Sequence, residues 1–319
     1  MLGGHPMRKK KITIVTPTFN EEAGIFECYT KVKELFNTKL PQYDYEHLFI
    51  DNASTDNTVA ILKEIAAKDR NAKLIVNSRN FGLSRSPYYG MLQMTGDAVV
   101  PMVADLQTPP DLIVQFVEKW EAGSKMVLAI RTGMKEGIFL RALRNIFYTI
   151  ISKISHVEQI RHFIGYGLFD KYIIDIMRSL DDPCPYFRGI ISEIGFQKAL
   201  VEYQQPARKH GRSRHSIFDL LELALMGITS YSKVPLRLVT ILGFIVSTLS
   251  LVGAIVYLLL KIIFWYTFPV GIAPIIISIF FIASVQLICI GFVGEYVGLI
   301  FEHIRKRPLV IEKERINFD

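Results

Sequence analysis

Asp105 is a carboxylate placed where it could take part in chemistry. It follows the apolar run Ala98–Met102 and precedes the turn Thr108-Pro109-Pro110. A carboxylate at the end of a buried strand suits Mg²⁺ or Mn²⁺, because these ions take hard oxygen ligands, commonly one or two carboxylates with phosphate oxygens. The alternative is an Asx turn before Pro109 with no ligand. Asp105 is therefore a candidate metal ligand.

A second polar loop, Asp51–Thr58, follows the apolar run Tyr45–Ile50. An aspartate at such a strand end can accept hydrogen bonds from a base or a ribose. Asp56 or Asn57 can instead cap the helix that follows. Capping accounts for one of those two residues and leaves Asp51 unexplained, which favours a binding role for Asp51.

A third polar loop reads Pro17-Thr18-Phe19-Asn20-Glu21-Glu22 and follows the β-branched run Ile12–Thr16. This loop has a proline at the end of a strand and acidic residues at the start of a helix. Such a loop can bind a ligand at the edge of the sheet. Glu21 and Glu22 could also be helix N-terminal acids that the helix dipole favours. The loop alone leaves both interpretations open.

The elements that position these loops alternate between strand and helix, which predicts an α/β fold with a doubly wound, mostly parallel sheet and helices on both faces. The predicted strands are Ile12–Thr16, Tyr45–Ile50, Lys73–Val76 and Ala98–Met102. The predicted helices are Glu21–Phe36, Thr58–Lys68 and Ser84–Met94. Ligands of such sheets bind beyond the carboxyl ends of the strands. Four candidate residues fall there: Asn20, Asp51, Arg79 and Asp105.

Two long uncharged stretches predict a membrane anchor. Leu238–Leu260 and Ile262–Gly294 carry no charged residue, and each is long enough to span a bilayer. Two adjacent stretches of this kind argue against buried core helices of a soluble protein. The second helix is predicted over Pro274–Phe292, after an aromatic interfacial turn at Phe264–Pro269. Basic flanks place both chain ends in the cytosol by the positive-inside rule: Lys233, Arg237, Arg305, Lys306 and Arg307.

Two amphipathic or apolar segments precede the anchor. Ile138–Ile154 is basic and amphipathic, and it is either a helix packed on the domain core or a helix lying on the membrane face. Ser216–Ser232 is an apolar helix leading toward the membrane. The net charge of +7 suits anionic lipid, phosphorylated substrates or nucleic acid, and the position of the basic residues beside the spans favours lipid and phosphate. Three distant cysteines exclude a disulfide framework and a structural zinc site.

Taken in order, the motifs resemble the family 2 glycosyltransferases, which use P-x-x-N-E-E, D-x-S-x-D-x-T and D-x-D motifs on a nucleotide-binding fold called GT-A. Arg79-Asn80-Phe81-Gly82 is similar to the family's R-N-x-G segment. Asp105–Pro110 reads D-L-Q-x-P-P, as in the polyprenyl-phosphate glycosyltransferases, which include dolichyl-phosphate mannose synthase and bacterial undecaprenyl-phosphate enzymes. Further matches cover nearly the whole chain: Arg188-Gly189, Gly195-Phe196, Arg208, Gly211, Ser213, Gly294-Glu295-Tyr296, Gly298 and Arg307-Pro308.

The resemblance implies inverting transfer of a sugar from a nucleoside-diphosphate sugar to the phosphate of a membrane polyprenol, with Mg²⁺ or Mn²⁺ as cofactor. Asp105 would hold the metal and Gln107 would lie beside the diphosphate, as the catalytic pair. The residues implied to bind the nucleotide sugar are Pro17, Asn20, Glu21, Asp51, Ser54, Arg79 and Arg131. Arg208, Ser213 and Arg214 lie in the family's R-x-x-G-x-S-K/R segment and would hold the acceptor phosphate. A solvated basic loop or a lipid-headgroup patch is the alternative for that segment.

Two departures from the family pattern keep a rival function open. The family's first metal-motif aspartate falls on Val103, and the stretch Phe163–Leu168 lacks the acidic G-D-F-R segment of many relatives. A catalytically degenerate transferase acting as a membrane assembly partner would explain both. A processive polysaccharide synthase is disfavoured, because the chain lacks Q-x-x-R-W and further spans.

The predicted organisation has four parts. These are a flexible N-terminus at 1–10, a cytosolic GT-A domain with interfacial helices at 11–232, a two-helix transmembrane anchor at 233–303 and a cytosolic tail at 304–319. The predicted location is the bacterial inner membrane. The expected partners are the nucleotide sugar, polyprenyl phosphate, the bilayer, a further copy of the chain, a flippase and a downstream glycosyltransferase, with no nucleic acid.

Overall fold

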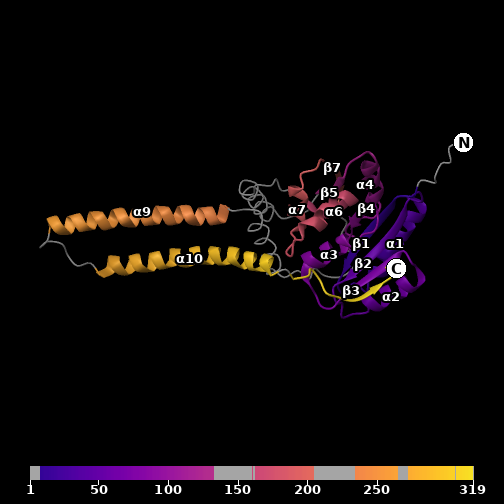
Figure 1. Ribbon diagram of the computed structural model, residues 1–319, viewed down its shortest axis with the longest axis horizontal. Coiled ribbons are helices and arrows are strands. Elements are labelled where there is room, and N and C mark those ends of the chain that lie inside the picture. Colours follow the sequence, from indigo (N-terminus) through magenta and orange to yellow (C-terminus); the bar gives the residue numbers. More distant parts are fainter. Residues whose placement is uncertain are drawn as a thin grey trace.

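The computed structural model describes residues 8–132, 160, 162–204, 234–264, 272–305 and 307–318 of the 319-residue chain. Most of the described residues form one eight-stranded sheet with helices on both faces, and two long helices extend away from it (Figure 1). The predicted helices Ile138–Ile154 and Ser216–Ser232 lie outside the described residues.

The sheet is mixed, because two of its eight strands, β6 and β8, run against the other six. Its spatial order is β7-β5-β6-β4-β1-β2-β3-β8. Four neighbouring pairs are parallel and three, all involving β6 or β8, are antiparallel. The strands are β1 (Lys11–Thr18), β2 (Asp44–Asp51), β3 (Ala72–Asn77), β4 (Ala98–Pro101), β5 (Met126–Thr132), β6 (Phe163–Asp170), β7 (Lys198–Gln204) and β8 (Glu312–Ile316).

The four predicted strands are confirmed as β1 to β4, and each forms a short run of buried residues whose side chains alternate between two covered faces. Ile12 and Ile14 of β1 pack toward one face, and Val15 packs toward the other. All three side chains are fully buried. A strand covered on both faces carries apolar residues at successive positions, which is why these runs stand out in the sequence.

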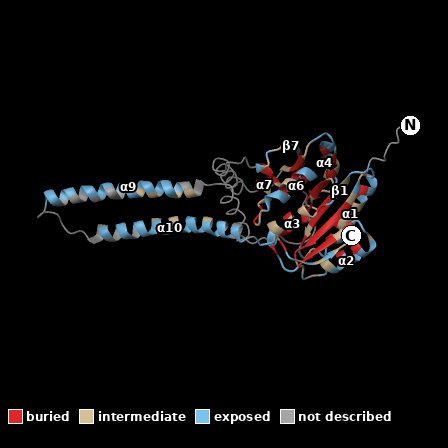
Figure 2. Ribbon diagram, viewed as in Figure 1, coloured by how far each residue is buried: buried red, intermediate tan, exposed pale blue. Residues whose placement is uncertain are grey.

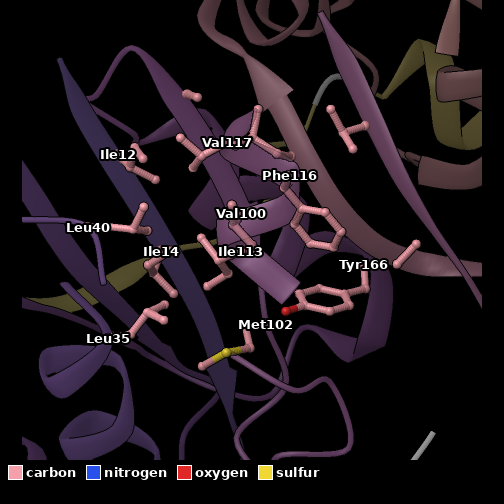
Figure 3. Close-up of a cluster of buried hydrophobic side chains, with 14 of the residues drawn as sticks. Ile12, Ile14, Leu35, Leu40, Val100, Met102, Ile113, Phe116, Val117 and Tyr166 are labelled. Carbon is pink, nitrogen blue, oxygen red and sulfur yellow. The ribbon is translucent and has the colours of Figure 1, made fainter. Parts of the chain in front are cut away.

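The helices divide between the two faces of the sheet. Helices α1 (Ile25–Thr38), α2 (Thr58–Lys68) and α4 (Leu112–Glu121) cover one face, and α3 (Gly82–Leu92), α6 (Lys171–Leu180) and α7 (Phe187–Glu193) cover the other. Figure 3 shows the core under α1 and α4, where Leu35 and Ile113 meet Ile14 and Val100 of the sheet. Helix α2 begins and ends as predicted, whereas α1 begins at Ile25 and not at Glu21.

Helices α9 (Val234–Ile263) and α10 (Ile272–Ile304) extend together from the sheet domain (Figure 1). Their described side chains are mostly exposed although they are apolar (Figure 2). Among the described residues, one window, Phe281–Gly298, is long and apolar enough to cross a membrane, and none of it is buried. The apolar segment found in α9 is shorter, Leu238–Leu249. The structure therefore contains one candidate membrane helix by this criterion.

Residues 304–319, expected as a cytosolic tail, include the last strand of the sheet. Residues Glu312–Ile316 form β8, which pairs antiparallel with the edge strand β3. The local sequence offers no strong strand signal here, because the segment is mostly charged. Pairing with an open edge supplies the hydrogen bonds that hold it.

Candidate active site

Six of the eight strands end at one edge of the sheet, and the candidate residues gather there. Strands β1, β2, β3, β4, β5 and β7 all run in one direction, and β6 and β8 run in the other. Along the edge, Arg131 at the end of β5 comes first, then Asp105 after β4, then the loops after β1 and β2, then Arg79 after β3. The sheet thus brings together residues as far apart in the sequence as Asn20 and Arg131.

The loops after β1 and β2 interlock. Asn20 has a left-handed backbone (φ 56°), and its backbone N–H donates to the Ser54 hydroxyl at 2.8 Å. The Asn20 side-chain oxygen accepts from the backbone N–H of Thr55 at 2.7 Å. Glu21 donates its backbone N–H to the Thr58 hydroxyl at 2.8 Å. These contacts hold residues 21–24 in a turn, which explains why α1 begins four residues later than predicted.

Asp51 is fully buried and holds the second loop in shape. Its carboxylate accepts from the backbone N–H and the hydroxyl of Ser54, at 2.8 and 2.5 Å. Thr18 donates a third hydrogen bond to the same carboxylate at 3.1 Å. Because Asp51 has no exposed surface, its carboxylate in this conformation binds the loop itself. Its predicted contact with a nucleotide remains a prediction.

Asn52 joins the second loop to the loop after β3, and the sequence analysis missed it. Its side-chain N–H₂ donates to the Asn80 side chain at 2.8 Å and to the Gly82 carbonyl at 3.1 Å. Its oxygen accepts from the Asn77 side chain and from the backbone N–H of Phe81, at 3.2 and 2.9 Å. Asn52 is 7% exposed, so these bonds are shielded from water. No local pattern reveals this role, because the partners lie 25 to 30 residues away.

The two arginines flank the site from opposite sides. Arg79 is exposed, donates to the Asn80 carbonyl at 3.0 Å and lies over the Phe81 ring at 4.1 Å. Arg131 is half-buried and pairs in register with Tyr203 of β7. Five inter-strand steps separate their strands in the sheet order, or about 24 Å at ordinary strand spacing. The two side chains therefore start from opposite flanks of the predicted nucleotide site, and Pro17 lies between them within β1.

Asp105 lies in a tight loop after β4. Its carboxylate accepts from the backbone N–H of Gln107 at 3.0 Å, and the side chain is 8% exposed. Leu106 takes a left-handed backbone (φ 59°), and the Thr108 hydroxyl accepts from the backbone N–H of Val103 at 3.3 Å. The Asp105 carboxylate therefore forms the Asx turn considered from the sequence, and it also lies at the edge of the sheet where the strands end. Val103 is 41% exposed at the position of the missing aspartate.

Cys28 on α1 lies close to the charges of this edge. Burial, with smaller contributions from the charges of Asp105, Glu21 and Glu27, raises the pKa of its thiol to about 12. The loops after β1 and β4 lie beside each other because the two strands are paired. A neutral, inert thiol at this position has a packing role.

The loop that carries Asp105 also contacts a buried tyrosine. Tyr166 of β6 donates its hydroxyl to the carbonyl of Pro109 at 2.7 Å, and the residue is 2% exposed. Its ring meets Phe116 of α4 edge-on, with centroids 5.1 Å apart (Figure 3). Desolvation raises the pKa of this phenol, so it stays a donor at all ordinary pH values. Tyr166 belongs to the stretch that departs from the G-D-F-R pattern.

We expect Tyr166→Phe to slow sugar transfer about tenfold, because the loop that carries Asp105 loses a hydrogen bond and gains freedom to move. Tyr88→Phe is the matched control, since Tyr88 is an equally buried tyrosine that donates to a carbonyl, that of Met177, at 3.1 Å. Both variants should lose about 1 kcal/mol of stability. Transfer rates and hydrogen exchange of residues 103–110 measure the difference, and equal rates in the two variants would rule out the positioning role.

The side-chain oxygens in the loop after β4 suit a hard divalent cation that takes most of its ligands from a substrate. Asp105 offers one carboxylate, Gln107 adds an amide carbonyl, and Val103 offers nothing. No group of three or more His, Cys, Asp or Glu residues that could hold a metal occurs among the described residues. Mg²⁺ is commonly held by one or two carboxylates with phosphate oxygens and water, so one carboxylate is compatible with it.

Three predicted site residues lie outside the described residues, and two hollows lie away from the candidate site. Arg208, Ser213 and Arg214 lie outside the described residues. Two shallow hollows of about 470 and 490 Å³ lie at the opposite, amino-terminal edge, and they include Lys9 and Lys11 in one and Asp97 and Lys171 in the other. Neither hollow contains a predicted site residue, so the chemistry of the edge, and not the size of a hollow, locates the candidate site.

The chain is similar to known glycosyltransferases over almost its whole length. Residues 13–182, more than half of the 319, match glycosyl transferase family 2. The chain is 36% identical over 308 residues to a bactoprenol glucosyl transferase of Shigella phage SfX, covering 96% of this chain and 99% of that protein. It is 33% identical over 305 residues to an uncharacterized glycosyltransferase, YkcC, of Bacillus subtilis, covering 95% and 94%.

A solved structure of glucosyl-3-phosphoglycerate synthase from Mycobacterium tuberculosis, in complex with uridine diphosphate, is also similar. It aligns at 18% identity with a TM-score of 0.48 over 69% of this chain and 78% of that chain. The family match and the full-length relatives confirm the resemblance drawn from the motifs. The mixed α/β sheet is of GT-A type, and the chain belongs to glycosyl transferase family 2.

Proposed function

We propose that this chain transfers glucose from a nucleoside-diphosphate sugar to the phosphate of bactoprenol, which is undecaprenol. The product would be a polyprenyl-phosphate sugar used to modify cell-envelope glycans. The observation that carries the proposal is the 36% identity to a bactoprenol glucosyl transferase over 96% of this chain. That match extends beyond the sheet domain and includes α9 and α10, the part of the chain that suits a lipid acceptor.

The chemistry is an inverting displacement. A phosphate oxygen of the acceptor attacks the anomeric carbon, the new C–O bond forms, and the bond to the diphosphate breaks with its electron pair on the leaving oxygen. An acceptor phosphate is largely ionised near neutral pH, so no strong general base is needed. The work of the protein is then to align the two substrates and to stabilise the leaving group.

Different site residues would bind the nucleotide, the diphosphate and the acceptor phosphate. Asp51 and Ser54 would hold the second loop against the nucleotide, with Pro17, Asn20 and Glu21 of the adjoining loop beside it. Arg79 and Arg131 would contact the nucleotide sugar from opposite flanks of the edge. Gln107 would lie beside the diphosphate. Beyond the described residues, Arg208, Ser213 and Arg214 would grip the acceptor phosphate, since arginine holds a phosphate with two parallel hydrogen bonds.

Asp105 would hold Mg²⁺ or Mn²⁺. A cation there offsets the negative charge of the departing diphosphate. Asp105 suits this role because its loop is fixed by hydrogen bonds to Gln107 and Val103, which hold the carboxylate at the end of β4. Val103 has no side-chain oxygen, so water and phosphate oxygens would complete the coordination of the cation.

A panel of donors tests the function. Purified full-length protein in vesicles containing undecaprenyl phosphate would be given UDP-glucose, UDP-galactose, UDP-N-acetylglucosamine or GDP-mannose with Mg²⁺ or Mn²⁺. We expect glycolipid and free uridine diphosphate with UDP-glucose alone. Transfer of another sugar would correct the donor and keep the reaction class. No product with any donor would favour the degenerate assembly partner, which the valine at 103 suggests.

We propose that α9 and α10 form a two-span anchor in the bacterial inner membrane, with the sheet domain in the cytosol. The exposed apolar side chains of both helices support this, because a surface of that extent needs a lipid or protein cover. A further copy of the chain, a flippase and a downstream glycosyltransferase are the proposed protein partners.

The anchor predicts that both chain ends face the cytosol and that only the segment between the two helices faces the other side. Basic residues at 233, 237 and 305–307 on the same side supply the reason. Reporter fusions at Asp319 and between the two helices measure the topology. A reporter at Asp319 that is active in the periplasm would contradict it.

A further inference from the structure

The last described residues return from α10 to the edge of the catalytic sheet. Glu312–Ile316 pairs with β3 in the register Leu74↔Ile316 and Asn77↔Glu312. The contact continues one step further, where the backbone N–H of Ser78 donates to the Ile311 carbonyl at 2.9 Å. Ser78 immediately precedes the loop Arg79–Gly82 of the candidate site. The C-terminal strand therefore reaches the base of a predicted donor-binding loop.

Side chains fix this strand to α3. Glu312 accepts from the Tyr89 hydroxyl at 2.8 Å and pairs with Arg315 at 2.6 Å. Arg315 also donates to the Gln93 side chain at 2.8 Å. Burial would raise the pKa of Glu312, but the bonds from Arg315 and Tyr89 outweigh it and lower the pKa. Glu312 is therefore ionised at neutral pH and can hold both partners.

Asn317 closes the end of the strand. It takes a left-handed backbone (φ 64°), and its side-chain N–H₂ donates to the carbonyls of Ala66 and Ala72, both at 2.8 Å. Phe318 lies beneath the cations of Lys73 and Arg315, at 5.0 and 4.5 Å. Val310, at the other end, is 5% exposed. The segment is thus anchored along its length to β3 and to the helices on either side of it.

The same segment is tied by a short connection to α10. Helix α10 ends at Ile304, and eight residue steps lead to Glu312. A fully extended chain covers at most about 28 Å in eight steps. The end of the candidate membrane helix is therefore held within about 28 Å of the strand beside the Arg79–Gly82 loop.

We propose that the C-terminal strand, residues 309–318, is a positioning element for the Arg79–Gly82 loop. It would hold that loop in its donor-binding shape and within reach of the end of α10, with Glu312 and Asn317 as the positioning residues. The inference rests on the proposed function for the meaning of the loop. The alternative is that the strand only covers the open edge of β3, since an unpaired edge invites aggregation.

Asn317→Ala and Glu312→Gln in the full-length protein test the proposal. We expect hydrogen exchange of residues 79–82 to rise about tenfold, since the strand loses bonds that hold it against α2, α3 and β3. The Kd for uridine diphosphate, measured by calorimetry without lipid, should rise by a similar factor. Glu312→Gln keeps the shape of the side chain, so it gives a result even if Asn317→Ala fails to fold.

Arg178→Ala is the matched control. Arg178 also clamps a helix end through backbone carbonyls, those of Leu92 and Met94 at 2.6 and 3.0 Å, but at the far end of α3 from the loop. Arg178→Ala should lower the melting temperature and leave exchange at 79–82 unchanged. Faster exchange of residues 311–316 with no change at 79–82 would overturn the proposal and show that the strand only covers the edge of β3. Hydrogen exchange can be measured without sugar transfer. Its result therefore tests the positioning role even if the proposed function is wrong.

Discussion

Replacing Asp105 by asparagine should lower sugar transfer by roughly 10²–10³-fold, the range seen when one group that stabilises developing charge is removed. Val103 cannot ligate a cation, so Asp105 is the one carboxylate left in the motif. Asparagine keeps an oxygen that can accept from the backbone N–H of Gln107, a bond of 3.0 Å in the wild type. The loop should therefore keep its shape while the charge is lost. The measurement is initial transfer rate against Mg²⁺ or Mn²⁺ concentration.

Asp97→Asn serves as the control for Asp105→Asn. Asp97 also accepts from a backbone N–H, that of Lys11 at 2.8 Å, but at the amino-terminal edge of the sheet. Its transfer rate should stay within about twofold of wild type, since it lies at the far edge of the sheet. Binding of Mn²⁺ with uridine diphosphate, followed by calorimetry, gives a second readout without turnover. A rate for Asp105→Asn within a fewfold of wild type at limiting metal would refute the metal role.

Replacing Glu46 by glutamine should destabilise the sheet domain by about 3 kcal/mol at neutral pH. Glu46 is 1% exposed and pairs with Lys11 and Lys73, both at 2.8 Å. It also accepts from the Thr13 hydroxyl at 2.6 Å and the Thr95 hydroxyl at 2.7 Å. Removing the charge leaves two partly buried lysines without their common partner. The melting temperature should fall by about 6–12 °C for a domain of this size.

The pH dependence gives the second half of this prediction. Burial raises the pKa of Glu46, but the bonds from the lysines and threonines outweigh it and lower the pKa from 4.5 to about 2. A folded pKa below the unfolded one stabilises the protein above pH 4.5, and that stabilisation disappears as the pH falls toward 2. The shift corresponds to about 3 kcal/mol. The gap in melting temperature between wild type and Glu46→Gln should therefore narrow across that range.

Glu121→Gln measures how much an exposed ion pair contributes to the free energy of unfolding. Glu121 pairs with Lys10 at 2.7 Å, and the two side chains are 37% and 50% exposed. Its removal should cost under about 1 kcal/mol at any pH. A melting-temperature gap for Glu46→Gln that stays constant between pH 7 and pH 2.5 would show that the charge of Glu46 contributes nothing.

Several features of the fold were predictable because they depend on local pattern. The four strands β1 to β4 are short apolar runs between turn-forming residues, and α2 has a helical spacing with clear ends at Thr58 and Lys68. The positions of Asn20, Asp51, Arg79 and Asp105 at strand ends followed from those runs. The parallel sheet then placed all four at one edge, as expected.

Other features depend on partners far away in the sequence. Strands β6 and β8 run against their neighbours, so the sheet is mixed, and nothing local in Phe163–Asp170 sets its direction. Tyr166 supports the loop that carries Asp105 through a hydrogen bond to a residue 57 positions away. Asn52 joins two loops through bonds to residues 25 to 30 positions away. A polar side chain at a strand end is visible in the sequence, but its partner is not.

The sequence by itself therefore determined the class of the protein and the identity of its candidate site. Ordered motifs at strand ends and two apolar stretches are local features, and local features are read directly along the chain. Only the tertiary structure decided that Asp51 is buried behind its own loop, that residues 21–24 form a turn instead of the start of α1, and that the C-terminal segment is an edge strand. Each of these depends on hydrogen bonds between segments distant in the chain, whose free energy exists only once the sheet has assembled.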